Sequence, residues 1–333
     1  MARHEFTRPP LGDFHTSPFY GRDVISADDF SKPEVIQISD LATQIEMIQR
    51  NGGRSTILAG KIANVIFYEA STRTSGSFQA AMLLLGGDVI TYPDPKKFSS
   101  AAKGENLEDT ARTLDGQGHV TILRHVDIGS AAKAARAARN PVVNGGDGAG
   151  EHPTQALLDL HTILRTHGEV DGLTVTMMGD LKFGRTIHSL AKMLTMFEDI
   201  TLNFVSAEGL DMPEGIRDDL RTKGLGNQYA TRSLADVLPT TDVLYVTRTQ
   251  NERFQEEDPE FAEMIRLSIP LYQVTPEVME GAKTTMTLMH PFPRNEEIAP
   301  TVDDDPRAVY FDQADYGVDV REALLALILG RAV

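Results

Sequence analysis

Cysteine is absent from the 333 residues of this chain. The absence excludes disulfides, thiolate nucleophiles and zinc sites built on cysteine, and it is compatible with a reducing compartment. Long apolar runs are absent too, since the longest, ALLALIL at 323–329, is too short to cross a bilayer. The opening residues MARHEFTRPPLGDF carry no apolar signal-peptide core. We therefore predict a cytoplasmic protein without a membrane segment.

Positive charge is scarce. The 32 lysines and arginines are outnumbered by 48 aspartates and glutamates, which gives a formal net charge of −16. A surface this acidic repels nucleic acids and anionic membranes, so we expect neither as a partner. An anionic substrate would require a local cluster of arginines that outweighs the overall negative charge.

Apolar runs rich in strand-forming residues alternate with longer amphipathic segments, a pattern typical of parallel α/β architecture. The predicted strands are residues 63–69, 87–92, 119–125, 141–145, 173–180, 200–206, 241–248 and 284–290. The predicted helices are residues 72–85, 106–115, a segment through 131–138, 153–167, 185–196 and 322–329. The acidic stretch 251–266 is expected to form a long loop with some helix. Because the length exceeds that of a typical single core, we predict an α/β fold of two doubly wound parallel-sheet domains linked by helices.

Four arginines follow predicted strands or begin predicted helices: Arg73, Arg124, Arg185 and Arg248. In doubly wound sheets, ligands bind at the carboxyl ends of the strands. In a chain with a net charge of −16, four arginines at such positions indicate a site for a ligand with several negative charges.

The stretch FYEASTRTSGSF places Ser71, Thr72 and Thr74 where a helix is predicted to begin. Hydroxyl groups at this point cap the unpaired backbone N–H groups of a helix. Arg73 lies in the first turn, where the helix dipole disfavours a cation unless an anion lies nearby. Hydroxyls, N–H groups and a guanidinium together would form a phosphate site, but on its own the stretch fits a simple helix cap equally well.

The segment GDLKFGRT at 179–186 nearly matches the phosphate-binding loop of nucleotide enzymes. Arg185 stands where that loop requires lysine, and its planar guanidinium suits a carboxylate as well as a phosphate. An ATP-dependent phosphotransferase is therefore an alternative, weakened by this substitution and by the lack of a clear second acidic motif. A solvated arginine on a glycine-rich turn is the simplest explanation.

The segment EHPTQALLDLH begins a predicted helix, with Pro153 suited to the first turn. His152 could donate a hydrogen bond to a developing oxyanion, with Gln155 on the same turn, although a capping or packed histidine is the simpler interpretation. His152, His161 and His167 share no tight face with carboxylates, and H-E-x-x-H is absent, so we predict no metal site.

Two loops carry further candidates. Lys103, in the polar loop KKFSSAAKGENL, could close over an anion or simply face solvent. The loop HPFPR is stiffened by prolines, and its carbonyl groups near Phe292 and Pro293 could accept hydrogen bonds from an amine. Since neither a nucleophile elbow nor a pair of acid–base carboxylates occurs, we expect catalysis by positioning and electrostatics.

The motifs STRT, KGE, RH, HPTQALLDL, GDLKFGRT, TRTQ and HPFPR occur in this order and at family-like spacings. With them, nearly the whole chain resembles the transcarbamylase family, in particular its aspartate carbamoyltransferase branch. The resemblance implies transfer of the carbamoyl group of carbamoyl phosphate to L-aspartate in de novo pyrimidine biosynthesis, without a cofactor. It implies a carbamoyl-phosphate-binding domain of residues 1–152 plus 312–333 and an aspartate-binding domain of residues 153–311. It also implies a homotrimer with shared active sites and leaves open a regulatory chain as a partner.

The resemblance assigns the site residues in two groups. Those implied to bind carbamoyl phosphate are Ser71, Thr72, Arg73, Thr74, Ser99, Lys103, Arg124, His152 and Gln155. Those implied to bind aspartate are Arg185, Arg248, Gln250, Phe292 and Pro293. Arg73, Thr74, Lys103, Arg124 and His152 are implied to be catalytic. Ser99 and Lys103 are implied to reach the site of the neighbouring subunit.

Some positions depart from the family pattern. Ser75 and Gly76 stand where the family often has arginine and leucine, and Phe292 replaces a leucine whose role is through the backbone. An ornithine enzyme is an alternative, but two arginines suit the two carboxylates of aspartate, and ornithine enzymes typically place a cysteine in the loop at 290–293. A non-catalytic scaffold is a further alternative, opposed by the retention of every catalytic position.

Overall fold

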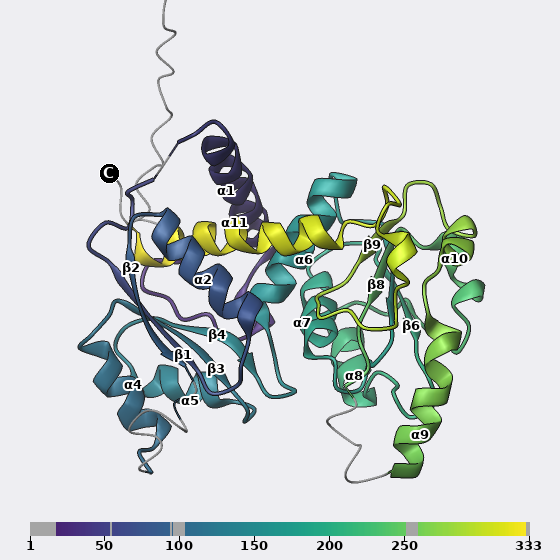
Figure 1. Cartoon of the computed structure of the whole chain (residues 1–333), viewed down its shortest axis with the longest axis horizontal. Coiled ribbons are helices and arrows are strands. Elements are labelled where there is room, and N and C mark those ends of the chain that lie inside the picture. The colour runs from purple at the N-terminus through teal and green to yellow at the C-terminus, as the bar shows by residue number, and fades with distance from the viewer. Residues whose placement is uncertain (1–17, 54, 94, 96–103, 251–258, 331–333) are drawn as a thin grey trace, which may run out of the picture.

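The computed structural model describes residues 18–53, 55–93, 95, 104–250 and 259–330. In this part of the chain, two parallel sheets lie side by side, and helices flank each of them (Figure 1). The arrangement confirms the predicted α/β fold of two doubly wound parallel sheets linked by helices. Within the same residues, no helix combines the length and the apolar character needed to cross a membrane.

The first sheet has four strands in the order β2-β1-β3-β4, and all neighbours are parallel. Its strands are β1 (Ile62–Phe67), β2 (Asp88–Pro93), β3 (Val120–His125) and β4 (Val142–Asp147). The strands β3 and β4 are buried throughout, as expected where helices cover both faces. Phe67 pairs with Arg124, so β1 and β3 end at the same edge. The polar segment after β1 therefore begins beside Arg124.

The second sheet has five parallel strands in the order β7-β6-β5-β8-β9. Its strands are β5 (Thr174–Met178), β6 (Thr201–Val205), β7 (Gln228–Thr231), β8 (Val243–Val246) and β9 (Thr287–Met289). The strand order reverses between β5 and β8, which is where ligands bind in doubly wound sheets. The GDLKFGRT segment follows β5, and Arg248 follows β8 two residues after its end.

The helices alternate with the strands along the chain. The α-helices described are α1 (Lys32–Arg50), α2 (Thr72–Leu84), α4 (Leu107–Asp115), α5 (Ser130–Ala137), α6 (Pro153–His167), α7 (Arg185–Leu194), α8 (Glu214–Thr222), α9 (Pro259–Ser268), α10 (Pro276–Glu280) and α11 (Tyr310–Leu329). Short 3₁₀ turns include η1 (Ala27–Asp29), η3 (Leu234–Asp236), η4 (Leu238–Thr240), η6 (Ile269–Tyr272) and η7 (Pro300–Val302).

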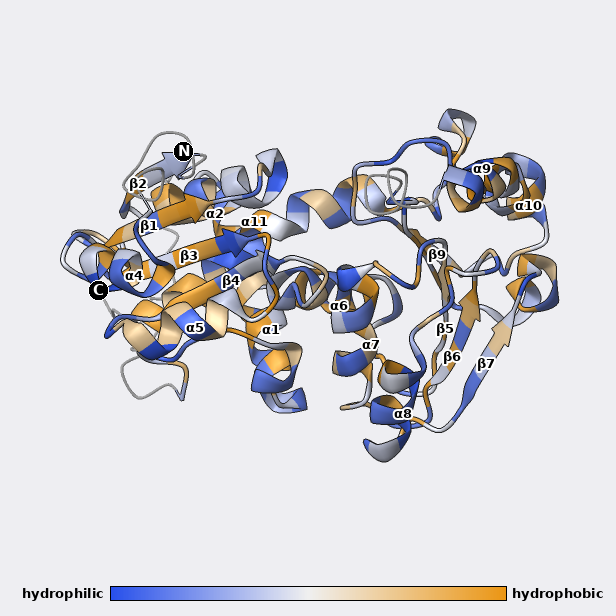
Figure 2. Ribbon diagram, turned by 90° about the horizontal axis from the view of Figure 1, so that it is seen from below, coloured by the Kyte–Doolittle hydropathy of each residue, from blue (hydrophilic) through white to orange (hydrophobic). Residues whose placement is uncertain are grey.

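Helices α6 and α11 join the two sheets. Pro153 occupies the start of α6, and Gly168, with φ of +80°, follows its end, as expected for these two residue types. Helix α11 packs against α1, α2 and α6 (Figure 1). One continuous apolar core contains residues of both helices and of strands from both sheets, including β1 and β5. Figure 2 shows hydrophobic residues along β1 and β3 between helices of mixed hydropathy.

The predicted elements agree with the structure in position more often than in length. The helix at 153–167 has the predicted bounds, and the predicted strands agree within three residues at either end. The helix predicted over 322–329 is wrong in length, because α11 begins at Tyr310. In the acidic stretch 251–266, residues from Pro259 onward form α9, and residues 251–258 lie outside the described part. Helices α1, α8 and α10 and strand β7 were not predicted.

Candidate active site

A cavity of about 860 Å³ opens where the carboxyl ends of the two sheets face each other. All predicted site residues that the structure describes line this cavity, namely Ser71, Thr72, Arg73, Thr74, Arg124, His152, Gln155, Arg185, Arg248, Gln250, Phe292 and Pro293. Ser99 and Lys103 lie outside the described residues. The cavity thus gathers these predicted residues from six separate segments that are distant in the sequence but adjacent in the fold.

The amino end of α2 forms one wall of the cavity. Ser71 caps the helix, and its hydroxyl accepts a hydrogen bond from the backbone N–H of Thr74 at 3.4 Å. Arg73 lies near Arg248 of the other sheet, and partial burial together with the positive charge of Arg248 lowers the pKa of Arg73. Two guanidinium groups are stable this close when an anion lies between them. The arrangement therefore combines a helix cap with the features of an anion site.

Glu69 holds two of the arginines together, a role that the sequence did not reveal. Its carboxylate oxygens lie 3.2 Å from Nη2 of Arg124 and 3.4 Å from Nη1 of Arg185. Burial favours the protonated form of Glu69, but the two guanidinium groups outweigh burial and lower its pKa. A Cβ atom at Gly146 would lie 3.1 Å from Nη1 of Arg124 and 3.3 Å from Cζ of Arg185, so glycine permits this close approach. Arg124 also donates to the carbonyl of Gly145 at 3.2 Å.

His152 is 3% exposed and stands at the start of α6. Its Nε2 lies 3.4 Å from Oγ1 of Thr74, and its backbone N–H donates to Oγ of Ser189 at 3.0 Å. Burial, followed by the charges of Arg185, Arg124 and Arg321, holds the pKa of His152 well below its ordinary value. The ring is therefore neutral near pH 7 and can donate one hydrogen bond without carrying charge. Its Nδ1 is buried and has no hydrogen-bond partner among the described residues.

A buried carboxylate, that of Asp159, binds two glutamines that line the cavity. Asp159 accepts hydrogen bonds from Nε2 of Gln155 at 2.9 Å, Nε2 of Gln313 at 2.7 Å and the hydroxyl of Tyr245 at 2.9 Å. Burial raises the pKa of Asp159 to about 7 despite these three donors. Because the NH₂ group of Gln155 donates to Asp159, the carbonyl oxygen is the end of this amide that is left to accept from a ligand in the cavity that Gln155 lines. Asp159 and Gln313 were not predicted as site residues.

The loop after β9 forms another wall of the cavity, and its Phe292 ring lies 5.8 Å from Cζ of Arg73 on α2. Nδ1 of His290 accepts the backbone N–H of Phe292 at 2.9 Å, so Nε2 carries the proton and donates to Glu297 at 2.9 Å. Phe292 has φ of +54°, which is uncommon for a residue with a side chain. The backbone N–H of His290 donates to Oε1 of Gln313 at 2.8 Å, which ties this loop to the Asp159 network.

Of the residues assigned to aspartate by resemblance, Arg185, Arg248 and Gln250 follow β5 and β8, and Phe292 and Pro293 lie in the loop after β9. Arg185 begins α7, and its Nη1 also donates to the carbonyl of Gly148. The backbone N–H of Gln250 donates to Asp180 at 3.1 Å, and Arg248 donates to the carbonyl of Thr249 at 3.2 Å. Among the described residues, no group of three or more histidine, aspartate or glutamate side chains could hold a metal ion.

Two family models match the chain almost end to end. Residues 22–165 match the model described as the aspartate/ornithine carbamoyltransferase carbamoyl-P binding domain, and residues 171–328 match its Asp/Orn binding domain. The chain belongs to the aspartate/ornithine carbamoyltransferase family. The transcarbamylase resemblance is thereby confirmed.

Curated relatives of this carbamoyltransferase-family chain include the aspartate carbamoyltransferase catalytic subunit of Thermococcus kodakarensis. It is 46% identical over 310 residues, which cover 93% of this chain and 97% of the relative. The multifunctional protein pyr1-3 of Dictyostelium discoideum is 43% identical over 94% of this chain. The chain spans only 14% of that protein's length, and likewise 14% of the multifunctional protein CAD of Squalus acanthias.

Solved structures of the family also align over nearly the whole chain. Aspartate transcarbamoylase from Trypanosoma cruzi, in complex with carbamoyl phosphate and aspartate, aligns with a TM-score of 0.89 at 39% identity over 97% of this chain and 100% of the other. The same enzyme in complex with N-(phosphonacetyl)-L-aspartic acid aligns with a TM-score of 0.88 at 40% identity, covering 94% and 97% of the two chains.

Proposed function

We propose that this carbamoyltransferase-family chain is an aspartate carbamoyltransferase of de novo pyrimidine biosynthesis. It would transfer the carbamoyl group of carbamoyl phosphate to L-aspartate and release N-carbamoyl-L-aspartate and phosphate. The observation that supports this most is the single cavity lined by Arg73, Arg124, Arg185 and Arg248 in a chain with a net charge of −16. A phosphate, two carboxylates and the oxyanion that forms on the carbamoyl group account for these four cations.

The cavity suggests a role for each wall. The hydroxyl and N–H groups at Ser71–Thr74, with Arg73, would bind the phosphate. Arg185 and Arg248, with Gln250, would each take one carboxylate of aspartate. The carbonyl oxygen of Gln155 would accept from the carbamoyl NH₂ group. The backbone at Phe292 and Pro293 would position the carbamoyl and amino groups.

Catalysis would rest on charge stabilisation. The aspartate amine nitrogen forms a bond to the carbamoyl carbon, and the carbonyl oxygen becomes a tetrahedral oxyanion. Arg124, His152 and Thr74 are the donors directed at that oxygen, and each remains in place throughout the step. The carbon–oxygen bond to phosphate then breaks, and phosphate leaves with the electron pair and takes up the proton that the amine releases. Arg73 and the amino end of α2 offset the charge on phosphate, with Lys103 from the neighbouring subunit.

We further propose the domain division and the assembly that the resemblance implies. Residues 1–152 with 312–333 would bind carbamoyl phosphate, and residues 153–311 would bind aspartate. The packing of α11 against α1 and α2 supports placing the carboxyl-terminal helix in the first domain. The assembly would be a cytoplasmic homotrimer in which Ser99 and Lys103 complete the active site of the neighbouring subunit. The resemblance leaves open whether a regulatory chain also binds.

The amine substrate provides the direct test. Purified protein given carbamoyl phosphate is expected to carbamoylate L-aspartate and not L-ornithine, because ornithine carries a cationic side chain that Arg185 and Arg248 would repel. A colorimetric assay for the ureido product, run with each amine separately, measures this. Product with ornithine alone would refute the assignment to aspartate.

Subunit mixing tests the shared site. Arg73→Ala and Lys103→Ala trimers are each expected to be inactive, since every site lacks one of the two cations. After exchange of equal amounts, roughly a quarter of the sites would combine an intact Arg73 with an intact Lys103 from the neighbour, because assortment in a cyclic trimer is random. Recovery is measured as turnover before and after exchange. No recovery, with exchange verified by native mass measurement, would argue against a site shared between subunits.

A further inference from the structure

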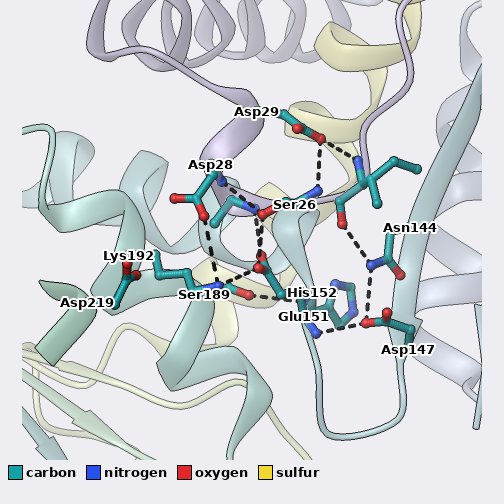
Figure 3. Close-up of polar contacts among 12 residues, drawn as sticks. Ser26, Asp28, Asp29, Asn144, Asp147, Glu151, His152, Ser189, Lys192 and Asp219 are labelled. Carbon is teal, nitrogen blue, oxygen red and sulfur yellow. Dashed lines mark hydrogen bonds and ion pairs between the residues drawn. The ribbon is translucent and has the colours of Figure 1, made fainter. Parts of the chain in front are cut away.

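Glu151, the residue immediately before His152, belongs to a polar cluster that also contains Ser26 and Lys192 (Figure 3). One carboxylate oxygen accepts from Nζ of Lys192 at 2.6 Å and from the hydroxyl of Ser26 at 2.9 Å. The other accepts from the backbone N–H of Ala27 at 2.6 Å. The side chains of Glu151 and Lys192 are only 17% and 20% exposed, so both charges are partly desolvated and depend on these contacts.

The partners of Glu151 come from both halves of the molecule. Ser26 and Ala27 belong to the amino-terminal segment, which is bonded to the first sheet through Val24 and β4. Lys192 lies on α7, which follows β5 of the second sheet. Ser189, one turn earlier on α7, accepts the backbone N–H of His152 at 3.0 Å (Figure 3). Helix α7 therefore contacts both residue 151 and residue 152.

The backbone of the same segment is also held from the first sheet. Asp147, at the end of β4, accepts the backbone N–H of Glu151 at 2.8 Å and that of Gly129 at 2.7 Å. The backbone at 151–152 is thus attached to β4 on one side and to α7 on the other. The side chain of His152 extends from this fixed backbone, and its Nε2 lies 3.4 Å from Oγ1 of Thr74 on α2.

We propose that Glu151 and Lys192 are positioning residues that fix the backbone from which His152 reaches the reacting carbonyl. The proposal rests on the function proposed above. Neither residue lines the cavity, so neither touches substrate. Their ion pair joins α7 to residue 151, and the hydrogen bonds of Glu151 to Ser26 and Ala27 join residue 151 to the amino-terminal segment. Together these contacts fix the direction of the His152 ring. A small displacement of a hydrogen-bond donor lowers the rate more than it weakens the binding of a distant part of the substrate.

The test compares two lysines that each join the same two halves of the molecule. Lys192→Met removes the pair with Glu151. The matched control, Lys32→Met, removes the pair in which Nζ of Lys32 lies 2.6 Å from Asp171, between α1 and the segment before β5 and away from the cavity. We expect Lys192→Met to lower kcat about 10-fold with KM for aspartate within about twofold, and Lys32→Met to change neither. Lys192→Arg, which keeps a cation beside Glu151, is expected to recover most of the rate.

A readout without substrate separates this proposal from the proposed function. The imidazole ¹H–¹⁵N resonance of His152, assigned with a His152→Gln variant, is expected to shift in Lys192→Met and to stay unchanged in Lys32→Met. Glu151→Gln combined with Lys192→Met should cost no more than the larger single effect, because the two residues act as one unit. An unmoved resonance, or equal losses of kcat in both lysine variants, would overturn the positioning role. A wild-type protein inactive with aspartate would overturn the proposed function and leave the resonance test intact. If Lys192→Met fails to fold, Lys192→Gln replaces it and the same outcomes apply.

Discussion

Replacing Arg124 by methionine is expected to lower kcat at least about 100-fold, because removing one donor of an oxyanion site typically costs this much. Arg124 is 8% exposed, and it is already fixed before substrate arrives by Glu69 at 3.2 Å and by the carbonyl of Gly145 at 3.2 Å. A donor held in this way requires no rearrangement when charge develops on the carbamoyl oxygen. Methionine keeps much of the apolar volume but removes both the charge and the hydrogen bonds.

A control must show that replacing any partly buried arginine by methionine does not lower kcat to the same extent. Arg307 serves for this, since its side chain is 18% exposed, pairs with Asp305 at 2.7 Å and donates to two backbone carbonyls, yet lies outside the cavity. Arg307→Met is expected to leave kcat within about threefold of wild type. Steady-state kinetics and circular dichroism on both variants measure this. A folded Arg124→Met variant with kcat near wild type would remove Arg124 from the proposed oxyanion site.

The elements that carry the site were largely predictable because local patterns define them. The run IANVIF is apolar enough for a buried strand, and the hydroxyls and proline that follow strands mark the starts of α2 and α6. The parallel arrangement then requires the strand ends to share an edge, which predicts that Arg73 and Arg124 lie together. Helix α1 was missed although its signal is present, since Ser31 and Glu34 form a capping box.

The residues that were missed depend on contacts between distant segments. Glu69 looks like the polar end of a strand, and its function arises because Arg185, 116 residues away, reaches it. Gln313 lies in the polar first part of α11, which has no clear helical pattern of its own, and it bonds to Asp159, 154 residues away. Packing of α11 against α6 brings these side chains together. No periodicity or motif within either segment encodes that packing.

Asp159→Leu is expected to destabilise the folded protein by at least about 3 kcal/mol, because it leaves several buried donors without an acceptor. Gln155, Gln313 and Tyr245 all donate to this carboxylate, which is fully buried. Asp159→Asn is expected to be far milder. Its carbonyl oxygen still accepts from both glutamines, and its NH₂ group can donate to the hydroxyl of Tyr245. Urea unfolding of both variants measures the difference.

The same pair of variants tests whether Asp159 sets the direction of the Gln155 amide. At a temperature where both are folded, Asp159→Leu is expected to lower kcat/KM for carbamoyl phosphate, whereas Asp159→Asn should keep it within about threefold of wild type. If Asp159 acts through Gln155, adding Gln155→Met to Asp159→Leu should cause little further loss, since groups in direct contact are not additive. Fully additive losses would mean that Asp159 stabilises the fold without orienting Gln155.

The pH dependence of stability tests whether burial raises the pKa of Asp159. Burial raises the pKa of Asp159 to about 7, whereas an unfolded aspartate titrates near about 3.9. Between these values the folded state binds a proton at Asp159 that the unfolded state lacks, so the contribution of Asp159 to stability falls as the pH rises from about 4 to about 7 and is constant above. The unfolding midpoint of wild type relative to Asp159→Asn should therefore fall over this window. Asp211 provides a control of opposite sign, because its hydrogen bond with Arg232 lowers its pKa. The unfolding midpoint of wild type relative to Asp211→Asn should therefore not fall over the same pH window. Equal pH trends for the two variants would mean that Asp159 keeps an ordinary pKa, and therefore that burial does not outweigh the three hydrogen bonds donated to this carboxylate.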